Sequence, residues 1–515
     1  MNPSALFAAV LLFVLPLFFF FFFFLAERRK KKSCSEKKII LPPSPPGLPF
    51  VGNLLQLGSL PHRSLRDLAG KHGPVFLLHL GRVPTVVVSS PASAEEFLRT
   101  HDLVFANRPA LKMIRVMTHN STAEVAFTRY GERWRQMRRI CASHLFSSKT
   151  VGSFSPLRRE VLLLLLERIA SSASKSTDGV VSMNEILNSF AVDMICRTTV
   201  GSSMGEERTK LVADLVRRNS AIFARVFVED YFSGLWWLDL LLGSDWRLRR
   251  LTKEWDDLLE EVIEEHVGRQ QGGGDQSKSS STTHAFIDSL LELQREPSLE
   301  FELKTKDIKT LLLDMFSAGI DTTTVTLEWA MAELIRHPKV MKKLQREVRE
   351  VGHGDVLISE EDSVKMRYLN AVIKEVFRLH PPAPLLLPRE SSDDCRIRGY
   401  DIPKGTRIFI NAWAFGRDPA RWEAPDEFRP ERFLDSSADY TGNDLHFIPF
   451  GAGRRICPGL HFAVVDVELA VANLVYRFDW ELPSYLASED FKMEEIAGLV
   501  VHREQKLELV PTPVY

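Results

Sequence analysis

The chain has 515 residues, of which 45% are hydrophobic and 26% are charged. This composition is typical of a globular protein and excludes a disordered or collagen-like chain. Its 66 Lys and Arg residues against 67 Asp and Glu residues leave a net charge of −1, which gives no electrostatic drive for binding nucleic acid. The five cysteines form no Cys-x-x-Cys pair, so they indicate neither a disulfide framework nor a structural zinc site.

The amino-terminal segment is apolar and is followed by positive charges. From Ala5 to Leu25 there is no charged residue, and a helix of that length rises by roughly 31 Å, about the thickness of the hydrocarbon layer of a membrane. The alternative is a cleaved signal peptide, but its positive charge would precede a shorter apolar run, whereas the basic cluster Arg28–Lys32 comes after this one. The sequence therefore predicts an uncleaved membrane anchor, residues 1–26, with the body in the cytosol by the positive-inside rule.

A basic and proline-rich linker, residues 27–49, is expected between the anchor and the body. Its prolines between Leu41 and Pro49 favour a stiff, extended backbone. Alternating apolar residues from Val75 to Ser90 then predict a small β-sheet. Further along, Trp134 and Arg138 are four residues apart and lie on one face of a predicted helix. From this spacing alone, packing is the plainer interpretation.

Helical periodicity dominates the rest of the chain. Apolar residues recur at intervals of three and four in the segments 157–171, 211–228, 255–267, 308–336 and 339–351. The stretch from Gln270 to Thr283 is rich in Gly, Ser and Gln and predicts an exposed loop. The chain is therefore expected to be mainly α with a small β region.

The helix predicted over 308–336 contains small and polar residues near its middle. Ala318 and Gly319 leave room for a flat molecule, and Asp321 next to Thr322 places an acid beside a hydroxyl group. Such a pair can deliver protons. The alternative is that Asp321, Thr322 and Thr323 only cap a helix that begins there.

Two charged motifs come next in the chain. Glu375 and Arg378 are three residues apart and can pair on a helix, which on a surface is usually a weak interaction. A proline-rich turn follows, with Arg389 in LLPRE, and the later segment FRPERF contains Arg432.

The most informative segment is FIPFGAGRRICPGLHFA, residues 447–463. Its single cysteine, Cys457, follows two glycines and two arginines and precedes Pro-Gly and an amphipathic helix. The glycines permit a tight backbone close to a bulky flat ligand. Phe450 can cover the sulfur, and amides at the start of the following helix can stabilise a thiolate. A lone cysteine is more often a small buried apolar residue, so its neighbours carry the interpretation.

The pattern F-x-x-G-x-R-x-C-x-G, matched from Phe450 to Gly459, resembles the haem-binding signature of the cytochrome P450 family. AGIDTT, the E-x-x-R pair and FRPERF resemble the other motifs of that family, in the expected order, and look most like its plant microsomal A-type branch. The resemblance implies the cytochrome P450 fold, with a single catalytic domain over residues 50–515 behind an N-terminal transmembrane helix in the endoplasmic reticulum membrane.

The resemblance also implies haem b as cofactor, with Cys457 as the thiolate ligand of the iron. Phe450 is expected to cover the sulfur. A guanidinium group can bind a carboxylate through two parallel hydrogen bonds, so Arg455, Arg138 and Arg389 are expected to bind the haem propionates. The indole N–H of Trp134 is expected to bind a propionate as well. Arg454 has no such role and is expected on the surface.

On the dioxygen side, the resemblance implies that Thr322 and Asp321 deliver the protons with which dioxygen is split. Glu375, Arg378 and Arg432 are expected to form a buried triad that supports the core beside the haem ligand.

The implied reaction inserts one atom of dioxygen into a small lipophilic substrate and reduces the other to water. The chain shows no dinucleotide-binding or flavin-binding motif, so its electrons are expected from an NADPH-dependent cytochrome reductase, with cytochrome b5 as a helper. One alternative is a haem-thiolate dehydratase or isomerase that does not oxygenate, and another is a membrane carrier of haem or sterol without turnover. The intact Asp321 and Thr322 pair argues against both.

Substrate choice is expected in four largely apolar segments that face the haem, 105–122, 312–318, 383–388 and 496–501. They suit a terpenoid, a steroid, a phenolic or an oxime, and the sequence does not rank these classes.

Overall fold

The computed structural model describes residues 39–201, 204–271, 285–296, 301–496 and 498–514. The predicted anchor, residues 1–26, and most of the predicted loop from Gln270 to Thr283 lie outside these residues. Within the described part of the chain, no helix is both long enough and apolar enough to cross a bilayer.

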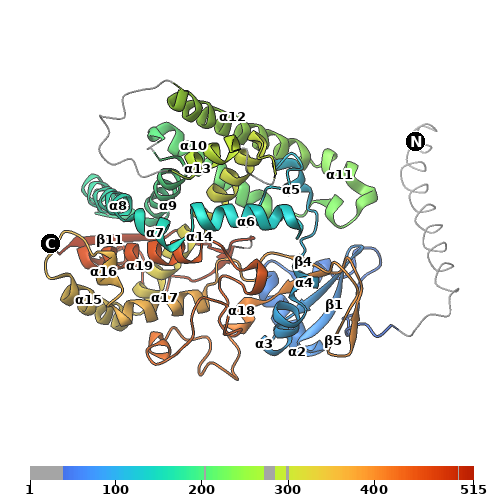
Figure 1. The fold of residues 1–515 in the computed structure, drawn as a ribbon. Helices are drawn as coiled ribbons and strands as arrows, with labels where there is room; N and C mark the ends of the chain where they lie inside the picture. The colour runs from blue at the N-terminus through green and yellow to red at the C-terminus, as the bar shows by residue number, and fades with distance from the viewer. Residues whose placement is uncertain (1–38, 202–203, 272–284, 297–300, 497, 515) are drawn as a thin grey trace, which may run out of the picture.

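Helices make up most of the molecule (Figure 1). The longer ones are α2 (Pro61–His72), α6 (Glu132–His144), α8 (Ser155–Lys175), α9 (Met183–Val200), α10 (Gly205–Phe223), α12 (Ser244–Gln271), α13 (Phe286–Arg295), α14 (Thr305–Arg336), α15 (Pro338–Gly352), α17 (Arg367–Leu379) and α19 (Leu460–Arg477). The short α-helices are α3 (Pro91–Glu95), α4 (Asp102–Phe105), α5 (Lys112–Met117), α7 (Ser148–Ser153), α11 (Trp236–Leu241), α16 (Glu360–Ser363) and α18 (Ala412–Phe415). Single turns of other helix types are η1 (Leu54–Leu57), η2 (Glu96–Thr100), η3 (Val228–Asp230), η4 (Ser233–Leu235), η5 (Pro430–Phe433) and η6 (Gly453–Arg455).

Four of the five predicted helical segments are confirmed, because 157–171, 255–267, 308–336 and 339–351 lie within α8, α12, α14 and α15. The prediction over 211–228 is wrong at its end, since α10 stops at Phe223. Beyond that point, the Asp239 carboxylate accepts hydrogen bonds from the backbone amides of Val228 and Glu229. A continuing helix would need those amides for its own carbonyls. Gln270, placed in a loop by the sequence, belongs to α12.

The strands form small separate sheets, of which the one with β1 and β4 lies at one side of the helices and the one with β11 lies at the other (Figure 1). The largest sheet has the order β1 (Val75–Leu80), β2 (Val83–Val88), β7 (Arg407–Ile410), β4 (Arg389–Glu390). The antiparallel β1 and β2 pair confirms the prediction over Val75 to Ser90, and β2 runs parallel to β7. The smaller sheets are formed by β3 (Val181–Ser182), β11 (Glu508–Pro513) and β8 (Phe478–Glu481), by β5 (Cys395–Ile397) and β6 (Tyr400–Ile402), and by β9 (Glu495–Ile496) and β10 (His502–Arg503).

The described end of the proline-rich linker lies against the sheets. The Leu77 amide in β1 donates a hydrogen bond to the Pro43 carbonyl at 2.8 Å, and the Asp401 amide in β6 donates to the Ile40 carbonyl at 2.7 Å. These contacts attach the segment to the body well before residue 50.

The helix α14 is the central element of the helical part, and most of its side chains are buried. It begins where Asp307 accepts a hydrogen bond from the Lys304 amide, and it ends before Pro338, because the residue before a proline avoids helical backbone angles. Helices α9, α10, α17 and α19 all contact it. Its middle is therefore held rigidly against the elements that carry the other predicted site residues.

Candidate active site

One internal cavity brings together nearly all the residues that the sequence singled out. It is lined by Arg138, Asp321, Thr322, Arg389, Phe450, Arg455 and Cys457. Trp134 does not line it but is buried behind it, and its indole N–H donates to the Val125 carbonyl at 2.9 Å. Residues far apart in the chain thus meet at one site, as the motif interpretation predicts.

Cys457 lies between η6 and α19, with its surface open to the cavity and not to the outside. Its amide donates to the Phe450 carbonyl at 2.9 Å, which closes the loop around the sulfur. Burial raises the pKa of the Cys457 thiol, while a hydrogen bond from the Gly459 amide and the nearby Arg138 guanidinium lower it. The net pKa of the Cys457 thiol is raised, because burial outweighs these two groups, which offset only part of the cost of burying a thiolate.

The loop before Cys457 depends on glycine for its shape. Gly451 and Gly453 have φ angles of 76° and 69°, in the left-handed region that glycine adopts without strain. A Cβ on Gly453 would also come within 2.5 Å of the Leu98 carbonyl oxygen. Phe450 packs against Phe377 and Tyr440, with ring centroids 5.0 Å and 5.8 Å away, so the side chain next to the sulfur is held in an aromatic cluster.

Positive charge is concentrated at one end of the cavity. Arg455 donates to the carbonyls of Ala106, Val125 and Thr128, and its guanidinium stacks 4.1 Å from the centre of the Trp134 ring. Burial, followed by repulsion from Arg389, lowers the pKa of Arg455.

The neighbouring arginines are held in similar ways. Arg138 donates to the Ile456 carbonyl at 2.6 Å, and Arg389 pairs with Asp102 at 3.3 Å. Among the described residues, no carboxylate pairs with Arg138 or Arg455 at ion-pair distance. Buried cations without a counterion are costly, so this end of the cavity suits a ligand that carries carboxylates. A flat group with two propionates and a metal beside Cys457 fits this set of residues.

The acid and hydroxyl pair lies in the middle of α14, so the alternative that Asp321, Thr322 and Thr323 cap a helix is wrong. The Thr322 hydroxyl donates to the Ala318 carbonyl one turn earlier, at 2.6 Å. A threonine in this position can exchange that bond for one to a ligand in the cavity. Arg454 is exposed, as predicted.

Two residues that the sequence analysis missed hold the Asp321 carboxylate. The Ser220 hydroxyl from α10 donates to one oxygen at 2.5 Å, and His502 Nε2 from β10 donates to the other at 3.0 Å. The second ring nitrogen of His502 lies 3.8 Å from the Glu328 carboxylate. Burial lowers the pKa of His502, but the two carboxylates outweigh it and raise that pKa to about 10. His502 is therefore a cation at neutral pH.

A pair of buried carboxyl groups also lines the cavity. Asp314 on α14 accepts a hydrogen bond from the Val125 amide, and Glu124 accepts one from the Phe127 amide. Burial raises the pKa of Glu124 to about 7 and that of Asp314 well above its ordinary value. The pair therefore retains a proton near neutral pH, which limits the charge that it presents to the cavity.

The predicted triad beside the haem-ligand loop is buried. Arg378 donates to both carboxylate oxygens of Glu375, at 2.7 and 2.8 Å, and Arg432 Nε donates to Glu375 at 2.9 Å. The remaining donors of Arg378 reach the carbonyls of Gly416, Pro425 and Glu427. The triad thus ties α17 to η5 and to the loop between them.

All four predicted substrate segments contribute to the cavity wall, through residues such as Ile114, Leu313, Ala383 and Leu499. Helices α9 and α10 also contribute, through Ile195, Thr198, Thr199, Asn219, Ser220 and Phe223, and the sequence analysis missed them. Apolar periodicity marked a helix over most of α10 but could not show which neighbour its faces meet.

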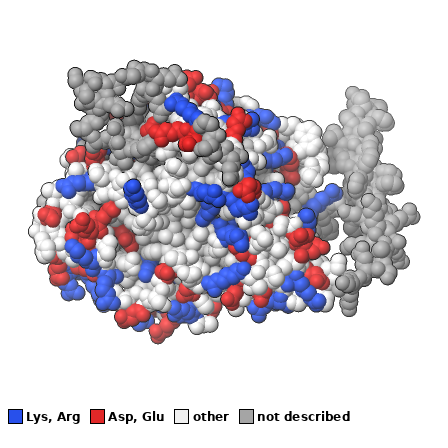
Figure 2. Space-filling view, in the orientation of Figure 1, with Lys and Arg blue, Asp and Glu red and all other residues white. Residues whose placement is uncertain are grey.

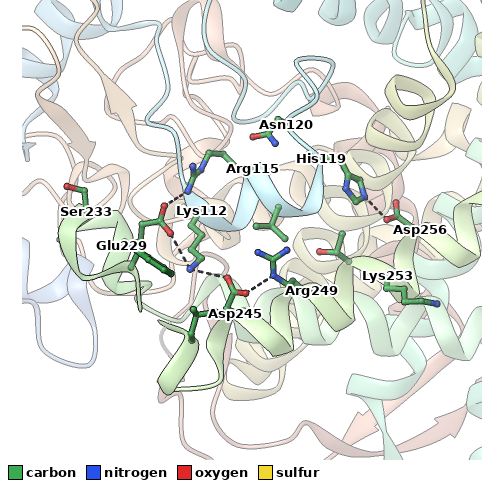
Figure 3. Close-up of a pocket in the computed structure, with 14 residues that line it drawn as sticks. Lys112, Arg115, His119, Asn120, Glu229, Ser233, Asp245, Arg249, Lys253 and Asp256 are labelled. Carbon is green, nitrogen blue, oxygen red and sulfur yellow. Dashed lines mark hydrogen bonds and ion pairs between the residues drawn. The ribbon is translucent and has the colours of Figure 1, made fainter. Parts of the chain in front are cut away.

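A second hollow opens on the outer side of α5 (Figure 3). Most of its charged side chains are paired with one another: Arg115 with Glu229, Lys112 and Arg249 with Asp245, and His119 with Asp256. Lys253 pairs with Asp257 of the same helix. The opposite face of α5 lines the inner cavity through Ile114 and Met117, so α5 is the wall between the two spaces. Because its charges are already matched, the outer hollow offers no free group for the cofactor.

Comparison with known proteins agrees with this geometry. Residues 42–509 match the family model described as Cytochrome P450. The chain is 48% identical over 462 residues to cytochrome P450 71A1 of Persea americana, covering 89% of this chain and 91% of the relative. It is 41% identical to phenylacetaldehyde oxime monooxygenase of Prunus mume, covering 91% and 88% of the two chains. A zebra fish cytochrome P450 structure with abiraterone superposes with a TM-score of 0.73 at 27% identity, covering 89% of this chain and 100% of that one. The chain belongs to the cytochrome P450 family of haem b monooxygenases.

Proposed function

We propose that this P450 monooxygenase is bound to the endoplasmic reticulum membrane and oxygenates a small lipophilic metabolite with electrons from an NADPH-dependent reductase. The observation that carries the proposal is one shared cavity, into which Cys457 opens from the loop before α19 and Asp321 and Thr322 open from α14. A carrier of haem or sterol has no need for an acid and a hydroxyl at that place. The same pair argues against a dehydratase or isomerase that does not oxygenate.

The proposed haem contacts follow from the cavity. Cys457 would ligate the iron, Phe450 would shield the sulfur, and Arg455, Arg138 and Arg389 would receive the propionates. In this arrangement Trp134 acts through Arg455, since it stacks on that guanidinium and donates its N–H to Val125. A thiolate-bound haem supplies the reductive activation of dioxygen and the cleavage of its O–O bond.

Asp321 and Thr322 are proposed to pass protons to that chemistry. The apolar walls of the four substrate segments, with the carboxyl pair Glu124 and Asp314 holding a proton, favour a substrate without strong charge. Terpenoids, steroids, phenolics and oximes meet this description, and one relative is named for an oxime.

Electrons would enter near α6. Figure 2 shows Lys and Arg side chains gathered over the region where α6 runs in Figure 1, and its exposed residues include Arg135 and Arg139. Arg138 of the same helix contacts the carbonyl next to Cys457. A basic surface above the proposed iron ligand suits an acidic partner such as a reductase, or cytochrome b5, by electrostatic steering.

Turnover tests the proposal directly. The purified holoprotein would first be titrated with a panel of lipophilic metabolites and scored for the spectral change of substrate binding. Accepted compounds would then be incubated with reductase, NADPH and isotopically labelled dioxygen. We expect a product with one labelled oxygen atom and no turnover without NADPH. Unlabelled product formed without NADPH would instead establish the dehydratase or isomerase alternative.

Replacing Thr322 with alanine should leave the haem spectrum unchanged but divert electrons to hydrogen peroxide. In the coupled reaction, dioxygen, two electrons and two protons yield one hydroxylated product and one water. Without the hydroxyl, the same electrons and protons leave as hydrogen peroxide, and the substrate stays unchanged. The measurement is product and peroxide formed per NADPH consumed.

The control for Thr322→Ala is Thr324→Ala. Thr324 makes an equivalent hydrogen bond to a carbonyl one turn earlier on α14, at 2.8 Å, but it does not line the cavity. We expect it to stay coupled. Full coupling in the Thr322 variant would remove the proposed proton role.

The membrane proposal rests on the uncharged run from Ala5 to Leu25 and on an apolar patch around α11. This patch consists of exposed side chains, Leu235, Trp236, Trp237, Leu240, Leu241, Leu242 and Trp246. Exposed tryptophans and leucines in one region are typical of contact with a membrane surface.

Charge in the α11 patch should weaken membrane binding. In a variant that lacks residues 1–38, the pair Trp237→Glu and Leu241→Glu should lower partition into phospholipid vesicles by at least about tenfold, since each loses roughly 1.5–3 kcal/mol of apolar burial. Vesicle flotation measures this. Val364→Glu is the control, because Val364 is 85% exposed and lies outside the patch. An equal loss in the control would argue against a specific membrane face.

A further inference from the structure

The carboxylate of Asp321 is fixed at both of its oxygen atoms. Ser220 from α10 donates to one oxygen at 2.5 Å, and His502 from β10 donates to the other at 3.0 Å. Asp321 is only 6% exposed. A carboxylate bonded in this way cannot rotate about its Cβ–Cγ bond without breaking one of the two hydrogen bonds. The direction in which Asp321 faces is therefore set by side chains on two other elements.

His502 is suited to this task because it stands between two carboxylates on one face of α14. Asp321 and Glu328 are two helical turns apart. The His502 ring bonds to Asp321 through Nε2 at 3.0 Å, and its Nδ1 lies 3.8 Å from the Glu328 carboxylate, at ion-pair distance. Glu328 is itself held by Asn184 Nδ2 at 2.7 Å. With a carboxylate on each side, both ring nitrogens keep their protons, so His502 stays a donor toward Asp321.

We propose that His502 is a positioning residue for proton delivery. Its N–H holds the Asp321 carboxylate beside Thr322, and without His502 part of the dioxygen is released as hydrogen peroxide. The inference rests on the proposed roles of Asp321 and Thr322 and adds a residue that touches neither the cofactor nor the substrate. When Asp321 is no longer held, the two electrons and two protons supplied with dioxygen leave as hydrogen peroxide. When it is held, they yield water and the oxygenated product.

The experiment compares two replacements of His502 in the full-length holoprotein. His502→Leu keeps an apolar side chain in place but removes the donor. His502→Gln keeps an N–H that can reach Asp321. With an accepted substrate and reductase, we expect the leucine variant to form about threefold to tenfold less product per NADPH, in line with the net contribution of a typical hydrogen bond. The glutamine variant should stay within about twofold of the unchanged protein, because its hydrogen bond remains.

A purely structural role of β10 is tested by Arg503→Gln. Arg503 follows His502 on the same strand and donates to the Lys492 carbonyl at 2.8 Å. All comparisons are made at equal content of carbon-monoxide-binding haem. Peroxide release in Arg503→Gln equal to that of His502→Leu would attribute the effect to strand packing and overturn the proposal. Equal uncoupling of the glutamine and leucine variants would overturn it as well.

Asp321→Asn separates this inference from the proposed function. If Asp321→Asn uncouples turnover and His502→Leu does not, the role of His502 is wrong while the proton pair stands. If Asp321→Asn is itself fully coupled, the proton pair is wrong. Should His502→Leu yield no holoprotein, Ser220→Ala removes the hydrogen bond to the other oxygen of the same carboxylate. Uncoupling there supports positioning, and full coupling opposes it.

Discussion

Replacing Cys457 with alanine should abolish the carbon-monoxide-bound Soret band that marks thiolate ligation, and with it all monooxygenase turnover. Cys457, in the loop before α19, lines the cavity and provides a sulfur atom that can bind a soft metal. The Gly459 amide and Arg138 both lower the pKa of this thiol, against the effect of burial. Alanine leaves the loop backbone intact but offers no ligand. The reduced, carbon-monoxide-treated spectrum measures the effect.

Cys196→Ala is the matched control for this prediction. Cys196 is buried in α9, and burial raises the pKa of its thiol to an extent that excludes a thiolate at neutral pH. Its loss should leave the spectrum unchanged. A variant Cys457→His that binds haem should show the band of a nitrogen donor instead. A thiolate band that persisted in Cys457→Ala would mean that another residue ligates the iron.

Replacing Arg378 with alanine should destabilise the protein by about 3–5 kcal/mol, which is the usual cost of breaking a buried ion pair. Arg378 and Glu375 are both almost fully buried, and Arg378 makes five hydrogen bonds. Its removal leaves the Glu375 carboxylate with Arg432 and the Arg429 amide as partners, and it takes the Arg378 donor away from the carbonyls of Gly416 and Pro425. The yield of holoprotein and the midpoint of denaturant unfolding measure the loss.

Arg378→Lys should recover little of that stability, because one ammonium group cannot replace the planar guanidinium group and its several N–H donors. The control is Arg429→Ala, which removes an arginine that pairs with Glu423 at 3.4 Å on the surface. Exposed pairs of this kind contribute about 0–1 kcal/mol. If the Arg378 and Arg429 variants were equally stable, the triad would have no structural role.

The site could largely be predicted because its motifs are local. The spacing around Cys457, the E-x-x-R pair and the small residues before Asp321 each encode a turn or one helical face. The structure places the Cys457 loop and the small residues before Asp321 around one cavity, and it places the E-x-x-R pair in a buried cluster with Arg432. In the middle of α14 the surrounding sequence led to the correct prediction, since the three residues Asp321, Thr322 and Thr323 alone could equally have been a helix cap.

The contacts that the sequence could not provide are those between distant segments. His502 meets Asp321 only because β10 returns along α14 near the end of the chain, and nothing in the residues around His502 indicates that return. The indole N–H of Trp134 donates to the Val125 carbonyl, a contact that helical spacing did not predict, and the expected role of Trp134 at a propionate stays a prediction. Helical spacing shows which residues share a face but not which neighbour that face meets.

The parallel pairing of β2 with β7, Thr85 to Arg407 through Val88 to Ile410, has a consequence for how the chain is made. During synthesis, the hairpin of β1 and β2 leaves the ribosome long before its partner strand exists, so the β2 edge stays open while most of the polypeptide is translated. Non-local pairing of this kind also slows folding. We therefore expect the early chain to depend on chaperones until its second half has emerged.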